Sequence, residues 1–356
     1  MEFVQESDFQ VEEFLSFGGS ANVYLVNKLN GVDRKQRYAM KVMSKAVVMQ
    51  TEHGIDCLMA ERDLLAYVDS PFIAKLYYAV QSPSTFCFIT EYVSGGTLLT
   101  FMERLGVLNI KFNNQLTKFF MSQLVLIVGY LHDSYILFRD LKPENLMLEK
   151  NGYLKLIDFG HARFIDKMNQ KVHTIAGTPG YKAPETLNPA DGYTKAVDWW
   201  AAGIIMYEMM YDRQPFSNED PAVDKKYATR EIKYPERSHV GPDAVNLIQQ
   251  LLQKNPEKRI GKGINDYTEV QSHLFFRRTN WSAVEKRTVP PPLPVGLSTI
   301  MEMDSFPERP QKLPKEEVEE VLEGFYYISP LIDSKMAKKR KSSDVDDLES
   351  KKQCLC

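Results

Sequence analysis

Two short strings hold the residues best suited to chemistry. Residues 138–145 read Phe-Arg-Asp-Leu-Lys-Pro-Glu-Asn, and residues 158–160 read Asp-Phe-Gly. Within about twenty positions they supply a carboxylate that can accept a proton, a lysine, and oxygen ligands for magnesium from an amide and a second carboxylate. Phosphoryl transfer from ATP needs these groups, because its loose transition state is stabilised mainly by positioning and by cations.

Each polar side chain in these strings has an expected role. We expect Asp140 to accept the proton of the attacking hydroxyl and to align its oxygen. Lys142 is expected to neutralise charge on the transferred phosphoryl group, while Asn145 and Asp158 are expected to hold Mg²⁺.

A predicted strand at residues 38–43 carries a further cation, Lys41. Side chains alternate along a strand, so Ala39 and Lys41 share one face, which suits a flat purine and its phosphates. Glu61, on a helix predicted over residues 55–68, is placed to orient Lys41 through an ion pair. An isolated lysine on a strand is more often a solvated one, and only the other motifs favour the phosphate-binding interpretation.

The glycine pattern expected before this strand is incomplete. The pattern G-x-G-x-x-G-x-V ending at Val23 falls on Ser16, Gly18 and Ala21, so only its middle glycine is present. Serine and alanine allow a close approach to phosphate but restrict the backbone, which predicts a weaker nucleotide clamp. The other residues expected to contact the nucleotide are Ala39, Lys41, Glu61, Thr90, Glu91, Val93 and Met147.

Together these motifs resemble the AGC group of serine/threonine protein kinases over nearly the whole chain. The strings that carry the resemblance are residues 38–43, 60–63, 138–145, 177–179, 275–276, 280–281 and 289–291. Phe138 stands where the family has histidine. Within the group, the chain is most similar to the ribosomal and mitogen/stress-activated kinase branch.

The resemblance implies an α+β, bilobal protein-kinase fold. A small β-rich lobe, a helical lobe and an AGC-type C-terminal tail are expected, with ATP and Mg²⁺ bound between the lobes and a protein serine or threonine as acceptor. The expected parts are an extension at 1–8, the small lobe at 9–93, the helical lobe at 94–276, the tail at 277–332 and a disordered charged end at 333–356.

The resemblance also implies regulation within the segment that runs from residue 158 to residue 185. Thr174 matches an activation site for an upstream kinase, and its phosphate would pair with Arg139 and Arg163; the alternative is a plain loop threonine. Glu185 is expected to pair with Arg259.

Asp198 is expected to brace the catalytic loop through backbone hydrogen bonds.

Substrate preference follows from the same resemblance. Glu144 and Glu208 match positions that contact arginines before the phosphorylated residue, and Thr178 belongs to the peptide-docking segment. Thr97 replaces a third acidic contact, so we expect a moderate preference for basic residues. Thr90 matches the gatekeeper position, and its small side chain leaves a back pocket open.

The tail contains two further matches. Phe306 matches an aromatic that approaches the adenine, and residues 322–327 resemble a hydrophobic motif that docks beside the Glu61 helix. Tyr326 occupies the position usually held by a phosphorylated serine or threonine, so control by phosphorylation there is not expected. The alternative is an amphipathic tail that fits any apolar groove.

Composition limits the remaining function classes. Apolar residues make up 44% and charged residues 26% of the 356 positions, as in ordinary globular proteins, and a formal net charge of −3 argues against nucleic acid as a partner. Cys57, Cys87, Cys354 and Cys356 have no disulfide-framework spacing, which favours a reducing, cytoplasmic location. The first ten residues lack the apolar core of a signal peptide, and no apolar run is long enough to span a bilayer.

Two signals near the end leave the location open. Residues 338–341 could direct nuclear import, but an acidic run follows them, and a solvated tail is the simpler interpretation. Cys354 and Cys356 lack the C-a-a-X spacing and resemble doubly prenylated ends, the one expected route to membrane contact.

Two rival functions remain at this stage. A pseudokinase would use the same fold as a scaffold, which the incomplete glycine pattern favours and the retained Lys41, Asp140, Asn145 and Asp158 oppose. A small-molecule kinase of related fold is opposed by the peptide-docking segment at residues 177–185.

Overall fold

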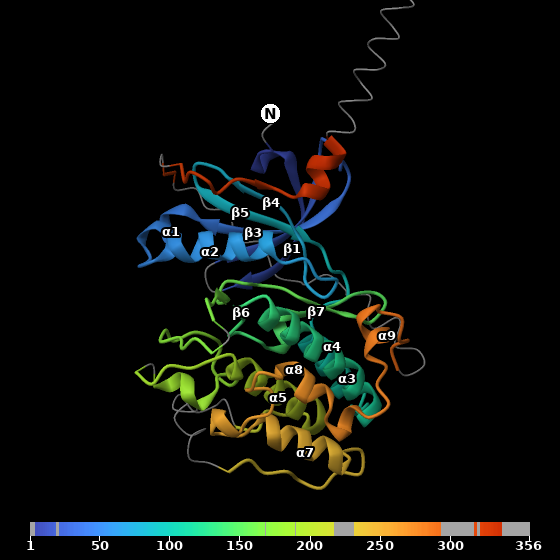
Figure 1. Cartoon of the computed structure of the whole chain (residues 1–356). Coiled ribbons are helices and arrows are strands. Elements are labelled where there is room, and N and C mark those ends of the chain that lie inside the picture. The colour runs from blue at the N-terminus through green and yellow to red at the C-terminus, as the bar shows by residue number, and fades with distance from the viewer. Residues whose placement is uncertain are drawn as a thin grey trace, which may run out of the picture. The chain divides into compact units, whose positions relative to one another are not determined.

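The computed structural model describes residues 4–18, 21–167, 169–188, 190–216, 231–292, 317–318 and 321–336 (Figure 1). The chain divides into a strand unit (Met1–Asp69, Ala74–Tyr92 and Asp304–Cys356) and a helical unit (Ser70–Ile73 and Val93–Met303). Phe306, Cys354, Cys356 and residues 338–341, which carry predictions about the tail, lie outside the described residues.

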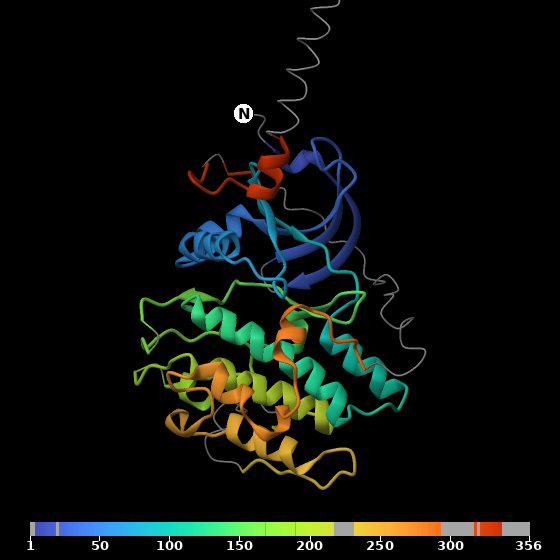
Figure 2. The ribbon, with the colours of Figure 1, turned by 45° about the vertical axis from the view of Figure 1, so that its right-hand side comes forward.

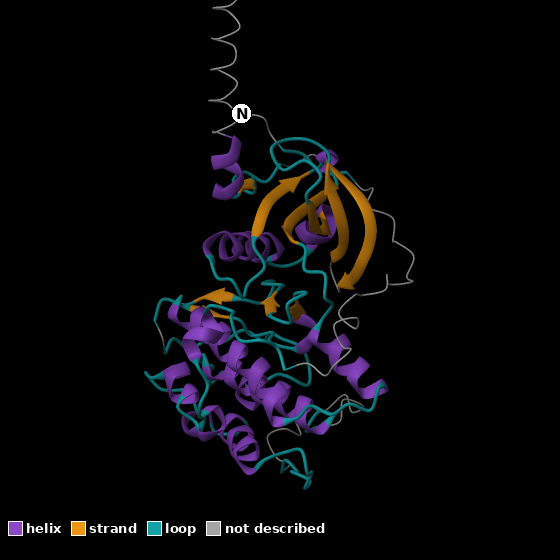
Figure 3. Ribbon diagram, turned by 90° about the vertical axis from the view of Figure 1, so that its right-hand side faces the viewer, coloured by secondary structure: helices purple, strands orange, loops and turns teal. Residues whose placement is uncertain are grey.

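The strand unit is built on a curved antiparallel sheet (Figure 3). Its strand order is β1-β2-β3-β5-β4-β10. The strands are β1 (Phe9–Gly18), β2 (Ala21–Lys28), β3 (Arg37–Ser44), β4 (Leu76–Gln81), β5 (Thr85–Glu91) and β10 (Tyr327–Ile328). A short 3₁₀ turn, η1 (Glu6–Asp8), precedes the sheet, and the helices α1 (Lys45–Gln50) and α2 (Gly54–Tyr67) connect β3 to β4.

The alternation predicted for β3 is present. Tyr38, Met40 and Val42 are buried in an apolar cluster, whereas Ala39 and Lys41 are partly exposed. The cluster joins this face of the sheet to Val4 near the start of the described chain.

Asn30-Gly31 is a sequence pattern typical of two-residue hairpin turns, but the connection between β2 and β3 is longer. It spans residues 29–36, with Gly31 at φ +85°. Oδ2 of Asp33 accepts hydrogen bonds of 2.6 Å from the hydroxyls of both Tyr38 and Tyr78. The longer loop therefore places a buried carboxylate between two buried tyrosines.

The end of the chain belongs to the strand unit. Strand β10 extends the sheet along β4, pairing Tyr327 with Ala79 and Ile328 with Tyr78. Residues 330–336 are helical, and Ile332 is buried in the same cluster as Val4. Residues 333–336, which were expected to be disordered, are therefore helical, because Ile332 anchors this segment to the sheet.

The helical unit packs its helices around α5, whose residues are almost all buried. The helices are α3 (Leu98–Val107), α4 (Asn114–Asp133), α5 (Ala196–Tyr211), α7 (Pro242–Leu251), α8 (Asp266–Gln271) and α9 (Trp281–Glu285). Helix α5 packs against α4 and α7, and α4 also packs against α8 and α9 (Figure 2). Long apolar patterns with helical spacing at residues 112–132, 195–211 and 244–252 of the sequence correspond to α4, α5 and α7.

Short strands and 3₁₀ turns carry the polar loops of this unit. The strands are β6 (Ile136–Leu137), β7 (Leu146–Leu148), β8 (Leu154–Leu156) and β9 (Arg163–Phe164), which form the pairs β6–β9 and β7–β8. The turns are η2 (Pro143–Asn145), η3 (Pro184–Leu187), η4 (Pro256–Lys258) and η5 (Leu274–Phe276). Within the described part of the chain, no helix combines the length and apolarity needed to cross a membrane.

Candidate active site

Asp140 lies in the loop between β6 and η2 and is held by three neighbouring side chains. Its Oδ1 accepts hydrogen bonds from the backbone N and the Oγ1 of Thr178, at 2.8 and 2.6 Å. Its Oδ2 lies 3.0 Å from Nδ2 of Asn145 and 2.9 Å from Nζ of Lys142. Because Asp140 is only 3% exposed, these contacts fix the direction of its carboxylate.

Asn145 and Asp158 are brought together by the backbone. The N–H of Ile157 donates to the carbonyl of Asn145, the last residue of η2, at 2.9 Å. This hydrogen bond places Asp158, the next residue after Ile157, close to Asn145 along the backbone. Nδ2 of Asn145 donates to both the backbone carbonyl and the carboxylate of Asp140. The amide oxygen of Asn145 therefore faces away from Asp140. Asp158 is exposed and has φ +61°.

The donor set fits magnesium. An amide oxygen and a carboxylate are hard ligands, and Mg²⁺ is often held by one or two protein oxygens plus phosphates and water. No cluster of three or more His, Cys, Asp or Glu side chains suited to a metal occurs in the part of the chain that the structure describes.

In the strand unit, Lys41 and Glu61 form the predicted ion pair. Nζ of Lys41 lies 2.6 Å from Oε1 of Glu61, which points from α2 and is only 6% exposed. The helix presents Glu61 on the same face as the buried Leu58, Leu64 and Leu65, and its apolar packing therefore fixes the carboxylate.

A comparison of the sequence with known protein families gives the same result as the motifs and their geometry. Residues 9–276 match the protein kinase domain family. The chain belongs to the protein kinase family. It is 36% identical over 312 residues to a protein named ribosomal protein S6 kinase beta from Caenorhabditis elegans, an alignment that covers 87% of this chain and 55% of the relative. The chain thus spans about half the length of that relative. The prediction of an AGC-group serine/threonine kinase with an α+β fold is confirmed.

The remaining residues expected to contact the nucleotide are distributed over both units of the kinase. Paired strands bring several of them together: Ser16 lies opposite Val23, Gly18 opposite Ala21, and Ala39 opposite Thr90. Glu91 ends β5, whereas Val93 and Met147 belong to the helical unit, with Met147 on β7. The tip of the glycine pattern, residues 19–20, lies outside the described residues.

Arg139 contacts the exposed Thr174. Its Nη1 donates to Oγ1 of Thr174 at 2.8 Å, and its Nε donates to the carbonyl of His161 at 2.6 Å. Arg163, the second expected partner, is exposed on β9, and no contact between its side chain and Thr174 is found within the described residues. Of the two expected cations, only Arg139 reaches Thr174.

Asp198 braces the catalytic loop of the kinase as predicted. Its two carboxylate oxygens accept hydrogen bonds from the backbone N–H groups of Phe138, at 3.0 Å, and Arg139, at 2.8 Å. The predicted pair of Glu185 and Arg259 is also present, with Oε1 and Nη1 2.5 Å apart. The Phe138 ring meets Phe159 edge to face, at a centroid distance of 5.3 Å.

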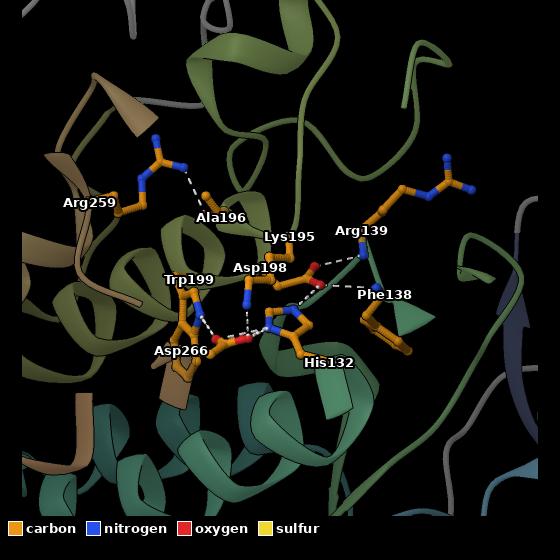
Figure 4. A network of polar contacts seen from close by, with 9 residues as sticks. All are labelled: His132, Phe138, Arg139, Lys195, Ala196, Asp198, Trp199, Arg259 and Asp266. Atoms are coloured by element: carbon orange, nitrogen blue, oxygen red, sulfur yellow. Dashed lines mark hydrogen bonds and ion pairs between the residues drawn. The ribbon is translucent and has the colours of Figure 1, made fainter. Parts of the chain in front are cut away.

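A buried charge network supports Asp198, and sequence reasoning missed it (Figure 4). His132 on α4 lies between Asp198, 3.1 Å from its Nε2, and Asp266, 3.0 Å from its Nδ1. Lys195 and the indole N–H of Trp199 also bond Asp266, at 2.6 and 2.7 Å. Burial alone would lower the pKa of His132, but hydrogen bonds and charges from Asp198 and Asp266 raise it to about 9. Burial opposes ionisation of Asp266, yet His132 and Lys195 lower its pKa.

Glu144 and Glu208 lie in one acidic group with Tyr181. The Tyr181 hydroxyl donates to Oε2 of Glu208 at 2.8 Å. Burial, with a smaller contribution from the charge of Glu144, raises the pKa of Glu208 to about 7 against the opposing hydrogen bonds from Tyr181 and Gln214. Oε2 of Glu144 is buried and has no hydrogen-bond partner among the described residues. The group therefore has acceptor capacity that no described residue uses.

Proposed function

We propose that this kinase transfers the terminal phosphate of ATP to serine and threonine hydroxyls of protein substrates. The observation that carries the proposal is the fixed carboxylate of Asp140, with Thr178 on one oxygen and Asn145 and Lys142 on the other. A buried carboxylate whose direction is fixed can receive the proton of an alcohol and hold its oxygen in line.

The other polar residues have complementary proposed roles. Lys41, oriented by Glu61, binds the phosphates of the nucleotide, and Lys142 offsets the charge that develops on the transferred group. Asn145 and Asp158 would hold Mg²⁺, which supplies a positive charge that screens the phosphate oxygens. Thr178 positions Asp140 and lies in the segment proposed to dock the peptide.

We propose a moderate preference for arginine before the phosphorylated residue. Glu144 and Glu208 provide carboxylates in one place, and the unused oxygen of Glu144 would accept from a guanidinium. A planar guanidinium bonds two acceptors at once, which a lysine ammonium cannot do in the same geometry.

Phosphorylation of Thr174 by an upstream kinase is a further proposal. The hydroxyl is exposed and already contacts Arg139, which would become a charged partner for the phosphate. The relative's name refers to a ribosomal protein, which supports a protein as the class of acceptor.

A pseudokinase scaffold is the second candidate, because Ser16 and Ala21 occupy positions where two glycines are expected. A scaffold would bind partners through the same fold without transferring phosphate.

The test compares the wild-type chain with Asp140→Asn. Each is incubated with Mg²⁺ and ATP labelled on the terminal phosphate, using a basic protein as acceptor. We expect Asp140→Asn to lower the labelling rate by roughly 10²- to 10⁴-fold, the usual contribution of a general base. Asp56→Asn, the same chemical change at an exposed position of α2, is the matched control and should retain the wild-type rate. No labelling by either chain would favour the scaffold, whereas equal labelling by wild type and Asp140→Asn would contradict the proposed role of Asp140.

A further inference from the structure

Tyr193 joins the loop before α5 to the segment that carries Thr174. Its backbone N donates to the carbonyl of Val172 at 3.0 Å, and the N–H of Val172 donates to its carbonyl at 2.8 Å. Its hydroxyl donates to the carbonyl of Thr174 at 2.6 Å and accepts from Nη1 of Arg139 at 3.3 Å. Tyr193 is only 2% exposed, and the hydrogen bonds of its hydroxyl are partly buried.

Arg139 is therefore occupied by neutral acceptors. Its Nη1 contacts the hydroxyls of Thr174 and Tyr193, and its Nε contacts the carbonyl of His161. The segment is ordered in this arrangement with an ordinary hydroxyl at Thr174. A phosphate on Thr174 is not the only group that can hold Arg139 and this backbone together.

Thr174 lies four residues before Thr178, the residue that contacts Asp140. Gly177 has φ +95°, and a Cβ built on it would lie 2.4 Å from the carbonyl oxygen of Arg139. The chain therefore passes so close to the catalytic loop at Gly177 that no side chain fits between them. The next residue, Thr178, donates both of its hydrogen bonds to Oδ1 of Asp140.

We propose that the Tyr193 hydroxyl is a positioning group that holds residues 172–178 against the catalytic loop while Thr174 is unphosphorylated, and thereby sustains basal kinase activity. The proposal rests on the proposed function and concerns a residue that the sequence motifs do not include. After phosphorylation, the charge-assisted contact between the phosphate and Arg139 would hold the same segment more strongly, so the share due to Tyr193 falls.

The experiment uses Tyr193→Phe, which keeps the buried ring and removes only the hydroxyl. Its matched control is Tyr153→Phe. Tyr153 is likewise 2% exposed, and its hydroxyl contacts backbone groups of Val289 at 2.8 and 2.9 Å. Wild type and both variants are prepared without phosphate at Thr174 and with phosphothreonine installed there by genetic code expansion. The value of kcat/KM is measured for a basic peptide.

For the unphosphorylated chain, we expect Tyr193→Phe to lower kcat/KM about three- to tenfold, a range set by losing the partly buried hydrogen bonds of the hydroxyl to Thr174 and Arg139. For the phosphorylated chain, we expect a change of less than about twofold, and Tyr153→Phe should change neither value by more than that. An equal loss in both phosphorylation states, or a loss matched by Tyr153→Phe, would overturn the proposal.

Amide hydrogen exchange over residues 172–178 supplies a readout that needs no catalysis. We expect faster exchange in unphosphorylated Tyr193→Phe than in wild type, and restoration by phosphorylation. If wild type transferred no phosphate, the proposed function would fail, and the exchange data would still decide whether the hydroxyl orders the segment. Unchanged exchange in unphosphorylated Tyr193→Phe would refute that role.

Discussion

The hydroxyl of Thr178 donates a 2.6 Å hydrogen bond to Oδ1 of Asp140, and the two residues are 38 positions apart in the sequence. The same hydroxyl accepts from Nζ of Lys142 at 2.7 Å. One side chain of the proposed docking segment thus contacts both the proposed base and the proposed phosphate-binding cation. In the proposed function, placement of the peptide and orientation of the base are coupled through Thr178.

Replacing Thr178 tests this coupling. Thr178→Val keeps the branched shape and removes the hydroxyl, so we expect kcat to fall about tenfold or more, because Asp140 loses a donor and Lys142 loses an acceptor. Thr178→Ser keeps the hydroxyl and should lose no more than about threefold. The measurement is steady-state phosphorylation of a peptide with both variants. Equal rates for valine and serine would show that the hydroxyl is dispensable.

The pH dependence of arginine preference tests the acidic group. Burial raises the pKa of Glu208 to about 7, so this carboxyl is largely protonated at pH 6 and largely ionised at pH 8. The ratio of kcat/KM for an arginine peptide to that for its alanine counterpart should rise over this interval, by about five- to tenfold. Taking the ratio removes the pH dependence of catalysis itself.

A stability measurement tests the His132 network. The raised pKa of His132, about 9, lies above the ordinary value of 6.5 that applies when the chain unfolds. The stability from this group is therefore fully present below about pH 6.5 and is lost as the pH rises through about 9, with a total on the order of 3 kcal/mol. Urea unfolding of wild type across this interval should show the decline, and His132→Gln should flatten it. The control, His161→Gln at an exposed position, should keep the wild-type slope.

The hydrophobic segment at the end of the described chain should contribute strongly to stability. Phe325 is 0% exposed, and its ring centroid lies 4.9 Å from that of Phe86 and 5.5 Å from that of Phe88. We expect Phe325→Ala to lower the free energy of unfolding by about 3–5 kcal/mol, as for other buried aromatics. Val321→Ala, at a side chain that is 69% exposed, is the control and should change it by less than about 0.5 kcal/mol. Similar values for the two variants would show that the docking of Phe325 is energetically unimportant.

Local patterns were enough to predict the elements that present the chemistry. The alternation around Lys41 placed its strand, and the helical spacing around Glu61 placed α2 within one residue at each end. The ion pair between them followed, because both residues sit at recognisable positions of short motifs.

Contacts between distant positions were not predictable in the same way. His132 and Asp266 are 134 positions apart, and each looks like an ordinary residue of an amphipathic helix. Tyr193 belongs to no recognisable sequence motif. The role of its hydroxyl becomes visible only in the fold, which brings Thr174 and Arg139 beside it. The helix at residues 330–336 was not predicted, because Ile332 is the one deeply buried residue in it and the sequence that follows is polar.

The pairing of β10 with β4 bears on how this protein can be shortened. The family match ends at residue 276, but β4 receives its outer partner from residues 327–328. A chain cut at the end of the match would leave backbone donors and acceptors of β4 unpaired and uncover Phe86 and Phe88. Unpaired edges beside apolar surface promote self-association. A soluble minimal version of this protein should therefore extend through residue 336.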